Sequence, residues 1–360
     1  MKYMDEYRDG SVAKALADRI RDISTKRIRL MEICGTHTMA IFRHGIRTLL
    51  PDTIELVSGP GCPVCVTATE DIDRAVKLAQ TKGVIVTTFG DMIRVPGSAG
   101  SLQTAQAEGA IVKMVYSTFD ALKIASENRD SNVVFLGVGF ETTAPTVAAA
   151  IQTAHAGGDG NFSVLSAHKL LPPAMDALLS GGNVLVDGFI CPGHVTTIIG
   201  TSSYEKVVKQ YHTPCVVTGF EPVDILQGIL MLVEQIESGR SQVEIQYSRG
   251  VSPQGNPGAL ALMEKVFEPC DTPWRGLGNI PKSGLAIRES FADFDAAKRF
   301  DLSVPPAHEP PGCLCAVVLR GAAAPPECKL FKNACTPRTP VGPCMVSSEG
   351  TCAAYFKYHM

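Results

Sequence analysis

The sequence predicts an α/β fold, in which two parallel-sheet domains face a cleft and a small cysteine-rich domain stands apart. Short runs rich in Val, Ile and Phe alternate with helical stretches between about residues 27 and 247, a pattern typical of parallel sheets with helices on both faces. The chain has 360 residues, more than one hydrophobic core usually serves. Six of its twelve cysteines lie between residues 305 and 360, where proline is frequent.

The first four predicted elements establish the alternation. "IRLMEIC" at residues 28–34 predicts a strand, and "TMAIFRHGIRTLL" at 38–50 predicts a helix. "TIELVSG" at 53–59 predicts the next strand, and "TEDIDRAVKLAQ" at 69–80 predicts the helix that follows it. The later strands are apolar runs of the same kind, each closed by Gly, Ser or Pro. They are predicted at residues 84–90, 111–117, 132–139, 162–167, 186–191 and 214–219.

Composition and charge narrow the class of protein. The net charge of −3 gives no reason to expect a nucleic-acid partner. The sequence has no apolar run of membrane-spanning length and no apolar signal-peptide core near its first residues. We therefore expect a cytoplasmic protein with no membrane partner. In that compartment cysteines are mostly reduced, so clustered cysteines indicate metal or redox chemistry rather than structural disulfides.

Three glycine-containing turns join a predicted strand to a predicted helix. They are "VGFETTAPT" at 138–146, "CPGHVTTIIG" at 191–200 and "TGFEPVDIL" at 218–226, and Thr142 or Thr143 is the expected N-cap of the first helix. Each turn places polar groups at a helix N-terminus, where backbone N–H groups can hold an anion. One such turn alone is more often a plain connection, but several together favour a ligand site at the carboxyl ends of the strands.

The cysteines near the carboxyl end form the strongest motif. They are Cys313, Cys315, Cys328, Cys335, Cys344 and Cys352. Structural zinc sites usually show paired C-x2-C motifs, and this segment has none. Four of the thiols follow the wide spacing C-x14-C-x6-C-x16-C, and proline follows two residues after Cys335. We favour a [4Fe–4S] cluster over zinc and over six incidental buried cysteines.

Cys34 and His37 are three residues apart, where the first strand gives way to a helix. The positive end of the helix dipole should lower the pKa of the Cys34 thiol. A soft thiolate beside an imidazole can bind iron, copper or zinc, but two ligands leave the coordination shell incomplete. A substrate or another protein would have to supply the rest. The alternative is a buried cysteine that caps the sheet.

Cys62 and Cys65 form a C-x-x-C motif between a predicted strand and a predicted helix. In an α/β context this motif is typical of thiol–disulfide chemistry. The pair could instead bind a metal, but the sequence has no second C-x-x-C motif to complete four ligands. The redox interpretation is therefore favoured.

Five blocks together resemble the HypD family of [NiFe]-hydrogenase maturation factors. They are "EICGTHTMAIFRHGIRTLLP", "GPGCPVCVT", "GFETTAP", "CPGHVTTIIG" and "GPCMVSSEGTCAAYFKY". The resemblance implies two α/β domains around a cleft, one formed by residues 27–57 and 160–250 and the other by 58–159. It also implies an iron–sulfur domain built from both chain ends, in which a helical segment at 1–26 packs with a module at 251–360.

The resemblance also assigns roles to the cysteines. Cys34 corresponds to the iron-binding cysteine, His37 to its associated histidine, and Cys62 and Cys65 to the C-x-x-C pair. The [4Fe–4S] ligands correspond to Cys313, Cys328, Cys335 and Cys352. Cys315 and Cys344 then resemble the redox-active pair beside the cluster in ferredoxin:thioredoxin reductase.

The function implied by the resemblance is that of a scaffold with redox chemistry rather than an enzyme of ordinary turnover. Such a scaffold binds a small HypC-family chaperone and holds a transient Fe(II). The Fe(CN)2CO unit is assembled on that iron with cyanide from HypE, and it goes on to the hydrogenase large subunit. Two other classes stay open on the residues alone: a general thiol–disulfide oxidoreductase, and an enzyme that binds nucleotide in the cleft.

Overall fold

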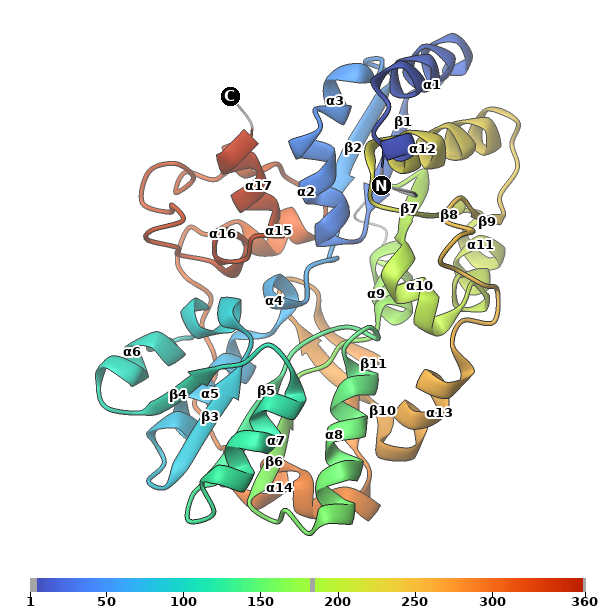
Figure 1. Cartoon of the computed structure of the whole chain (residues 1–360). Coiled ribbons are helices and arrows are strands. Elements are labelled where there is room, and N and C mark those ends of the chain that lie inside the picture. The colour runs from blue at the N-terminus through green and yellow to red at the C-terminus, as the bar shows by residue number, and fades with distance from the viewer. Residues whose placement is uncertain (1–4, 182–184, 359–360) are drawn as a thin grey trace.

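The computed structural model describes residues 5–181 and 185–358, and its backbone forms two parallel sheets (Figure 1). The first sheet has the strand order β2-β1-β7-β8-β9, and the second has the order β4-β3-β5-β6. Paired strands in both sheets run parallel. The prediction of an α/β fold with two parallel sheets is therefore confirmed. That the two sheets face a common cleft stays a prediction.

The strands and helices have the following bounds. The first sheet consists of β1 (Ile28–Glu32), β2 (Ile54–Ser58), β7 (Gly188–Pro192), β8 (Cys215–Thr218) and β9 (Val243–Ile245). The second consists of β3 (Val84–Thr88), β4 (Ile111–Met114), β5 (Asn132–Gly137) and β6 (Phe162–Ser166). An antiparallel hairpin consists of β10 (Phe267–Trp274) and β11 (Gly278–Ile287). The α-helices are α1 (Gly10–Ile23), α2 (Gly35–Arg43), α3 (Ile46–Leu49), α4 (Pro63–Val66), α5 (Thr69–Gln80), α6 (Leu102–Ala107), α7 (Thr118–Glu127), α8 (Ala144–Gly157), α9 (Leu171–Ser180), α10 (Gly193–Ile199), α11 (Glu205–Tyr211), α12 (Pro222–Glu237), α13 (Pro257–Val266), α14 (Ala296–Arg299), α15 (Cys315–Leu319), α16 (Pro343–Val346) and α17 (Thr351–Tyr358). Short 3-10 helices lie at Asp5–Tyr7, Gly90–Arg94, Ser202–Tyr204, Glu289–Phe294 and Pro325–Glu327.

The apolar strand runs are explained by burial on both faces of the sheets. Every residue of β3, β7 and β8 is buried, as parallel strands covered by helices on both sides require. The edge strand β4 buries only Val112. It ends at Met114 rather than at the predicted residue 117, because Ser117 caps α7 in a capping box with Asp120.

The predicted helix at 38–50 is two helices, and it starts earlier than expected. Gly45 takes a left-handed conformation with φ of 62°, which interrupts the helix between α2 and α3. At the other end, α2 begins at Gly35, directly after Cys34. His37 therefore lies in the first turn of α2, whereas the sequence analysis placed it before the helix.

Two of the predicted domain boundaries differ from the structure. Residues 162–166 were assigned to the first α/β domain, but β6 pairs with β5 in the second sheet. Residues 251–300 were assigned to the iron–sulfur module. Instead, Phe267 and Leu285 of the hairpin are buried in the same core as Phe162 and Val164 of β6. The hairpin supplies apolar surface that completes this second core, which sequence composition alone did not reveal.

The amino-terminal helix also lies elsewhere than predicted. Residues 5–26, the described part of the segment at 1–26, were expected to pack with the carboxy-terminal module. The apolar face of α1, with Ala13 and Ile20, is buried instead in a core with Ile225 and Ile229 of α12 (Figure 1). An ion pair between Arg8 and Glu221 joins the same two segments. The carboxy-terminal module packs through α17 against α2 and through α15 and α16 against α4.

Candidate functional site

The Cys34 turn and the C-x-x-C loop are in direct backbone contact. Cys34 follows β1 and is the residue before the first turn of α2. The Gly35 N–H donates to the carbonyl of Gly61, with an N···O distance of 3.0 Å. A Cβ atom at Gly61 would overlap the backbone of Ile33 and Cys34. Only glycine at position 61 therefore lets this loop lie against the Cys34 turn.

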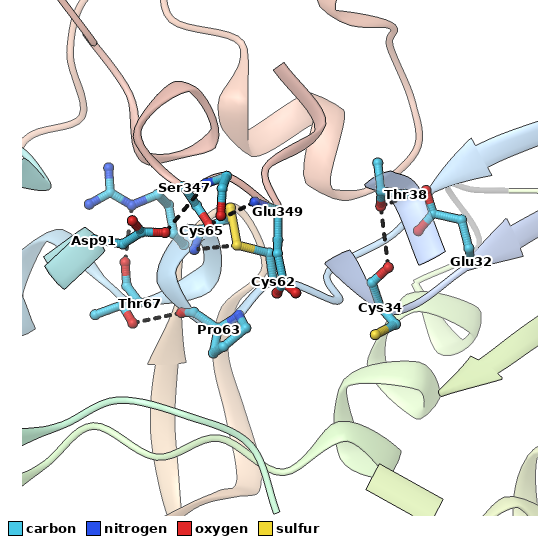
Figure 2. The surroundings of a disulfide bond; sticks show 12 residues. Glu32, Cys34, Thr38, Cys62, Pro63, Cys65, Thr67, Asp91, Ser347 and Glu349 are labelled. Carbon is cyan, nitrogen blue, oxygen red and sulfur yellow. Dashed lines mark hydrogen bonds between the residues drawn. A yellow bond between two sulfur atoms is a disulfide. The ribbon is translucent and has the colours of Figure 1, made fainter. Parts of the chain in front are cut away.

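Cys62 and Cys65 form a disulfide within the first turn of α4 (Figure 2). Their Cα atoms are 5.2 Å apart, and the Cys65 N–H donates to the Sγ atom of Cys62 over 3.2 Å. Both cysteines are buried. Pro63 occupies the first helical position, where its missing N–H costs no hydrogen bond. The structure thus shows the two thiols joined, in the arrangement a redox pair needs; their function as such a pair stays a prediction.

The prediction of a lowered pKa for Cys34 is wrong in direction. Burial, reinforced by the negative charge of Glu349, raises the pKa of the Cys34 thiol to about 12. Backbone N–H groups of Thr36 and His37 at the start of α2 act in the expected, lowering direction, but they are outweighed. Cys34 is therefore a protonated thiol at neutral pH and would lose its proton on binding a metal.

His37 is fully buried and points toward the end of β8. Its Nε2 atom lies 2.9 Å from the carbonyl oxygen of Gly219 and 2.8 Å from the Oγ1 atom of Thr218. Burial lowers the pKa of His37 to about 4, so the ring is neutral. A carbonyl acceptor assigns the proton to Nε2, which leaves the lone pair on Nδ1. Nδ1 has no hydrogen-bond partner among the described residues.

Glu349 joins the carboxy-terminal module to this site, and the sequence analysis did not single it out. Its Oε1 atom accepts a hydrogen bond of 2.6 Å from the Thr36 hydroxyl. A Cβ atom at Gly35, the residue after Cys34, would lie 2.6 Å from the Cβ atom of Glu349, so Glu349 packs against the start of α2 (Figure 2). The only sequence feature that points to Glu349 is its position between two cysteines in the block "GPCMVSSEGTCAAYFKY".

The glycine-containing turns at 191–200 and 218–226 also reach this region, through aromatic rings. Phe220 stacks on His37 with ring centroids 4.6 Å apart, and His194 lies over the same ring at 4.0 Å. Glu221 precedes α12 and pairs with Arg8. In the turn at 138–146, Thr143 is the N-cap residue of α8, one of the two expected residues. Its hydroxyl makes no capping hydrogen bond and instead donates to the carbonyl of Phe140 over 3.1 Å. Glu141 of the same turn accepts a hydrogen bond from the N–H of Leu171 at the start of α9.

The six carboxy-terminal cysteines come together in the structure. A small cavity is lined by five of them together with apolar side chains of Leu330, Phe331 and Met345; these five are Cys313, Cys315, Cys328, Cys335 and Cys352. The sixth, Cys344, is buried and shares hydrogen bonds with Cys315 and Cys352. These bonds raise the pKa of Cys344 well above its usual range and lower the pKa of Cys352 to about 6.

The thiol-lined cavity fits an iron–sulfur cluster in its donor set. A Cβ atom at Gly342 would lie 2.5 Å from the Sγ atom of Cys315 and 2.8 Å from that of Cys313, so a glycine keeps this cradle open. The Val341 N–H donates to the Sγ atom of Cys335 over 3.3 Å, and such bonds tune cluster sulfurs. Within residues 5–181 and 185–358, no three His, Cys, Asp or Glu side chains form a ready site for a single metal ion.

The fold and these sites define a class: an α/β protein with two parallel sheets, in which a disulfide, a partly buried thiol and a cysteine-rich module meet at one junction. In the described parts of the chain, no helix has the length and apolarity that crossing a membrane requires.

A family model described as "HypD: Hydrogenase formation hypA family" matches residues 11–359. The chain is 51% identical to the hydrogenase maturation factor HypD of Azotobacter vinelandii, over 99% of this chain and 97% of that protein. It is 48% identical to HypD of Rhizobium leguminosarum bv. viciae, over 99% and 96%. Identity is 44% to a putative hydrogenase expression/formation protein of Methanocaldococcus jannaschii, over 97% and 98%. The chain belongs to the HypD family, and its general role is in hydrogenase maturation.

Proposed function

We propose that this protein is a cytoplasmic scaffold on which the Fe(CN)2CO unit of [NiFe]-hydrogenase is assembled. In this proposal it acts with a HypC-family chaperone, receives cyanide from HypE and passes the unit toward the hydrogenase large subunit. The observation that supports it best is the backbone contact between the Cys34 turn and the Cys62–Cys65 loop at Gly61. That contact holds a metal-binding thiol and a redox-capable pair in one junction.

Cys34 anchors the iron, which is the cargo of the scaffold. A thiolate suits low-spin Fe(II) bearing CN and CO, because a soft donor favours a soft centre. Because burial and Glu349 raise its pKa to about 12, the thiol is protonated before iron binds. It releases that proton when iron binds. His37 offers its Nδ1 lone pair from the first turn of the same helix. The chaperone supplies further ligands, because these two groups leave the shell incomplete.

Cys62 and Cys65 supply the electrons for cyanide transfer. Releasing cyanide from a thiocyanate consumes two electrons: the S–C bond breaks, a thiol forms with one proton, and cyanide leaves for the iron. The two thiols of the pair provide both electrons as their S–S bond forms, and they release two protons. The balance is two thiols plus thiocyanate giving disulfide, thiol, cyanide and one proton.

The carboxy-terminal thiols Cys313, Cys328, Cys335 and Cys352 would hold a [4Fe–4S] cluster, with Cys315 and Cys344 as a second thiol pair. Such a cluster supplies electrons one at a time. The chain's own contribution is the cavity, lined by thiols and apolar side chains, and the contact of α15 and α16 with α4, which keeps the module beside the Cys62–Cys65 disulfide.

Infrared spectroscopy of the protein co-purified with its chaperone tests this function. We expect bands from iron-bound CN and CO in the wild type and their loss in Cys34→Ala. His37→Ala should weaken them less, because supporting residues typically cost about 10–100-fold in metal affinity. Cys270→Ala, which removes a half-buried thiol of the hairpin, is the matched control. Unchanged bands in Cys34→Ala, with the chaperone complex intact, would contradict the anchor role.

Burial of the disulfide favours this scaffold over a general thiol–disulfide oxidoreductase. Cys62 is 4% exposed and Cys65 is 0% exposed, so a bulky protein disulfide has no open approach to either sulfur. We expect no reduction of insulin disulfides by the reduced protein, measured as turbidity. Reduction at the rate of a thioredoxin would instead support the oxidoreductase.

A further inference from the structure

Arg275 is a fully buried arginine at the tip of the β10–β11 hairpin. Its side chain is 0% exposed, and its guanidinium makes two hydrogen bonds. The Nε atom donates to the backbone carbonyl of Thr67 over 3.1 Å, and Nη1 donates to the Oε2 atom of Glu309 over 3.0 Å. Nη2 is buried and has no partner among the described residues.

The positive charge of Arg275 is only partly compensated. Among the described residues its ion-pair partner is Glu309, whose side chain is 47% exposed, so water screens that carboxylate. Its other acceptor is a neutral carbonyl. A buried cation with an unpaired donor is costly unless further negative charge stands nearby. A further anionic group near the guanidinium of Arg275 would therefore stabilise it.

The hairpin tip lies between the two thiol sites. On one side, the backbone N–H of Arg275 donates to the carbonyl of Val66, the last residue of α4, over 2.9 Å. On the other side, a Cβ atom at Gly276 would approach the Cα atom of Ala316 to 2.7 Å, so the tip touches α15. Glu309 also accepts a hydrogen bond of 2.7 Å from the hydroxyl of Thr69, so it links Arg275 to the first residue of α5.

The hairpin tip also lies beside the thiol-lined cavity. The residue it meets on α15, Ala316, directly follows Cys315, which is the first residue of α15 and lines that cavity.

We propose that Arg275 is a positioning residue that serves as counter-charge for the thiol-lined cavity and clamps α4, with its disulfide, beside that cavity. The counter-charge role rests on the proposed function, because these thiols carry negative charge when deprotonated to hold a cluster. Negative charge in the cavity would then compensate the guanidinium, whose Nη2 atom has no partner among the described residues. The clamp role needs no cluster. It rests on the hydrogen bonds of Arg275 to the carbonyls of Val66 and Thr67 and on its bond to Glu309, which also accepts from Thr69.

The counter-charge role predicts reduction potentials of opposite sign for two substitutions. In the reconstituted full-length protein, Arg275→Gln should make reduction of the cluster about tenfold less favourable, equal to about 59 mV for a one-electron couple. Glu309→Gln keeps a hydrogen-bonding group opposite Thr69 but removes an anion, so it should raise the potential. Arg275→Lys keeps the charge and should stay near the wild type. Arg288→Gln, at the other end of the hairpin, is the matched control because its partner Glu268 is solvent-exposed. Potentials are read from visible absorbance and electron paramagnetic resonance.

The clamp role is measured in the metal-free protein. Reduction of the Cys62–Cys65 disulfide by dithiothreitol, followed by alkylation and mass spectrometry, should be several-fold faster in both Arg275→Gln and Arg275→Lys. Neither shorter side chain reproduces the fork that spans Thr67 and Glu309. Arg288→Gln should match the wild-type rate.

These readouts separate the possible failures. Unshifted potentials in Arg275→Gln and Glu309→Gln, with full iron content, would overturn the counter-charge role. An unchanged rate of disulfide reduction would overturn the clamp. If Arg275→Gln fails to fold, the sign of the Glu309→Gln shift decides the first role and Arg275→Lys the second. A wild-type protein that takes up no cluster would refute the proposed function, and the counter-charge role with it.

Discussion

Glu141 shows how burial alone changes the chemistry of a residue in this protein. Its side chain is 2% exposed, and burial raises its pKa from 4.5 to about 7. Oε1 accepts from the N–H of Leu171, but Oε2 has no partner among the described residues. The ionised form is therefore poorly compensated, and folding at high pH carries a cost that the unfolded chain does not have.

We expect Glu141→Gln to stabilise the protein at pH 8. The folded-state pKa lies above the unfolded value, so the folded state binds more protons between pH 4.5 and 7 and stability falls as pH rises through that window. The amide keeps an acceptor for Leu171 and removes the ionisation cost. At about 1.4 kcal/mol per pKa unit, the gain at pH 8 is up to roughly 3 kcal/mol. Urea unfolding at pH 8 and pH 5 measures it. A gain of equal size at both pH values would contradict the prediction.

Single-residue properties were the least predictable from the sequence. The spacing of Cys34 and His37 correctly indicated a thiol and an imidazole at one helix end. The pKa of Cys34 was predicted in the wrong direction, because it depends on burial and on Glu349, more than 300 positions away in the chain. The local sequence pattern predicts where the helix begins and hence the direction of its dipole. It does not predict which distant carboxylate packs beside that helix.

At the scale of elements, the carboxy-terminal module has little regular structure apart from α17. Its helices α15 and α16 have five and four residues, too short to be stable alone. The segment between them is held by turns and by the wall of the cavity. Metal binding should therefore contribute directly to the stability of this module.

Replacing a predicted cluster ligand should remove the iron, whereas replacing either of the other two cysteines of the module should not. Cys335→Ser and Cys352→Ser should lose the brown colour and about four iron atoms per chain under anaerobic isolation. Cys315→Ala and Cys344→Ala should retain both. Iron analysis and visible absorbance measure the difference. Full iron content in Cys335→Ser would refute its assignment as a ligand.

Gly342→Ala tests the cradle independently of the ligands. The added methyl group would crowd the Sγ atoms of Cys313 and Cys315, at 2.8 and 2.5 Å. We expect several-fold lower iron content although all six cysteines are present. Gly10→Ala, where a Cβ atom meets nothing within 4 Å, is the control and should keep wild-type iron. Equal iron content in both variants would show that the cavity accommodates the added methyl group and would contradict the prediction.

For the whole molecule, the strand pattern predicted the fold class but not its assembly. Each predicted strand was found, because buried parallel strands are continuous apolar runs. The predicted domain assignment of β6, the hairpin and α1 was wrong. Apolar periodicity shows that one face of an element is buried, but it does not show which other element packs against that face. Lys169 illustrates this: it is 1% exposed, and its Nζ atom lies 3.3 Å from Asp71 of α5 and 3.0 Å from the hydroxyl of Thr272 in β10.

Lys169→Met should destabilise the protein by about 3 kcal/mol, because it leaves a largely buried carboxylate of Asp71 without this cation. The double variant Lys169→Met/Asp71→Asn should recover part of that loss, since no uncompensated charge remains. Chemical unfolding at neutral pH measures both. A single variant within about 0.5 kcal/mol of the wild type would show that Arg74, 3.6 Å from Asp71, suffices as its partner.

The interrupted order of the first sheet has a consequence for synthesis on the ribosome. Strands β1 and β2 emerge first, but β7, the other neighbour of β1, begins at residue 188. At about 5–20 residues per second, β1 waits on the order of ten seconds with one edge unpaired. All four strands of the second sheet are made in that interval. The nascent chain thus makes every strand of its second sheet before β7 can pair with β1, and a chaperone that shields the exposed edge of β1 would act in that interval.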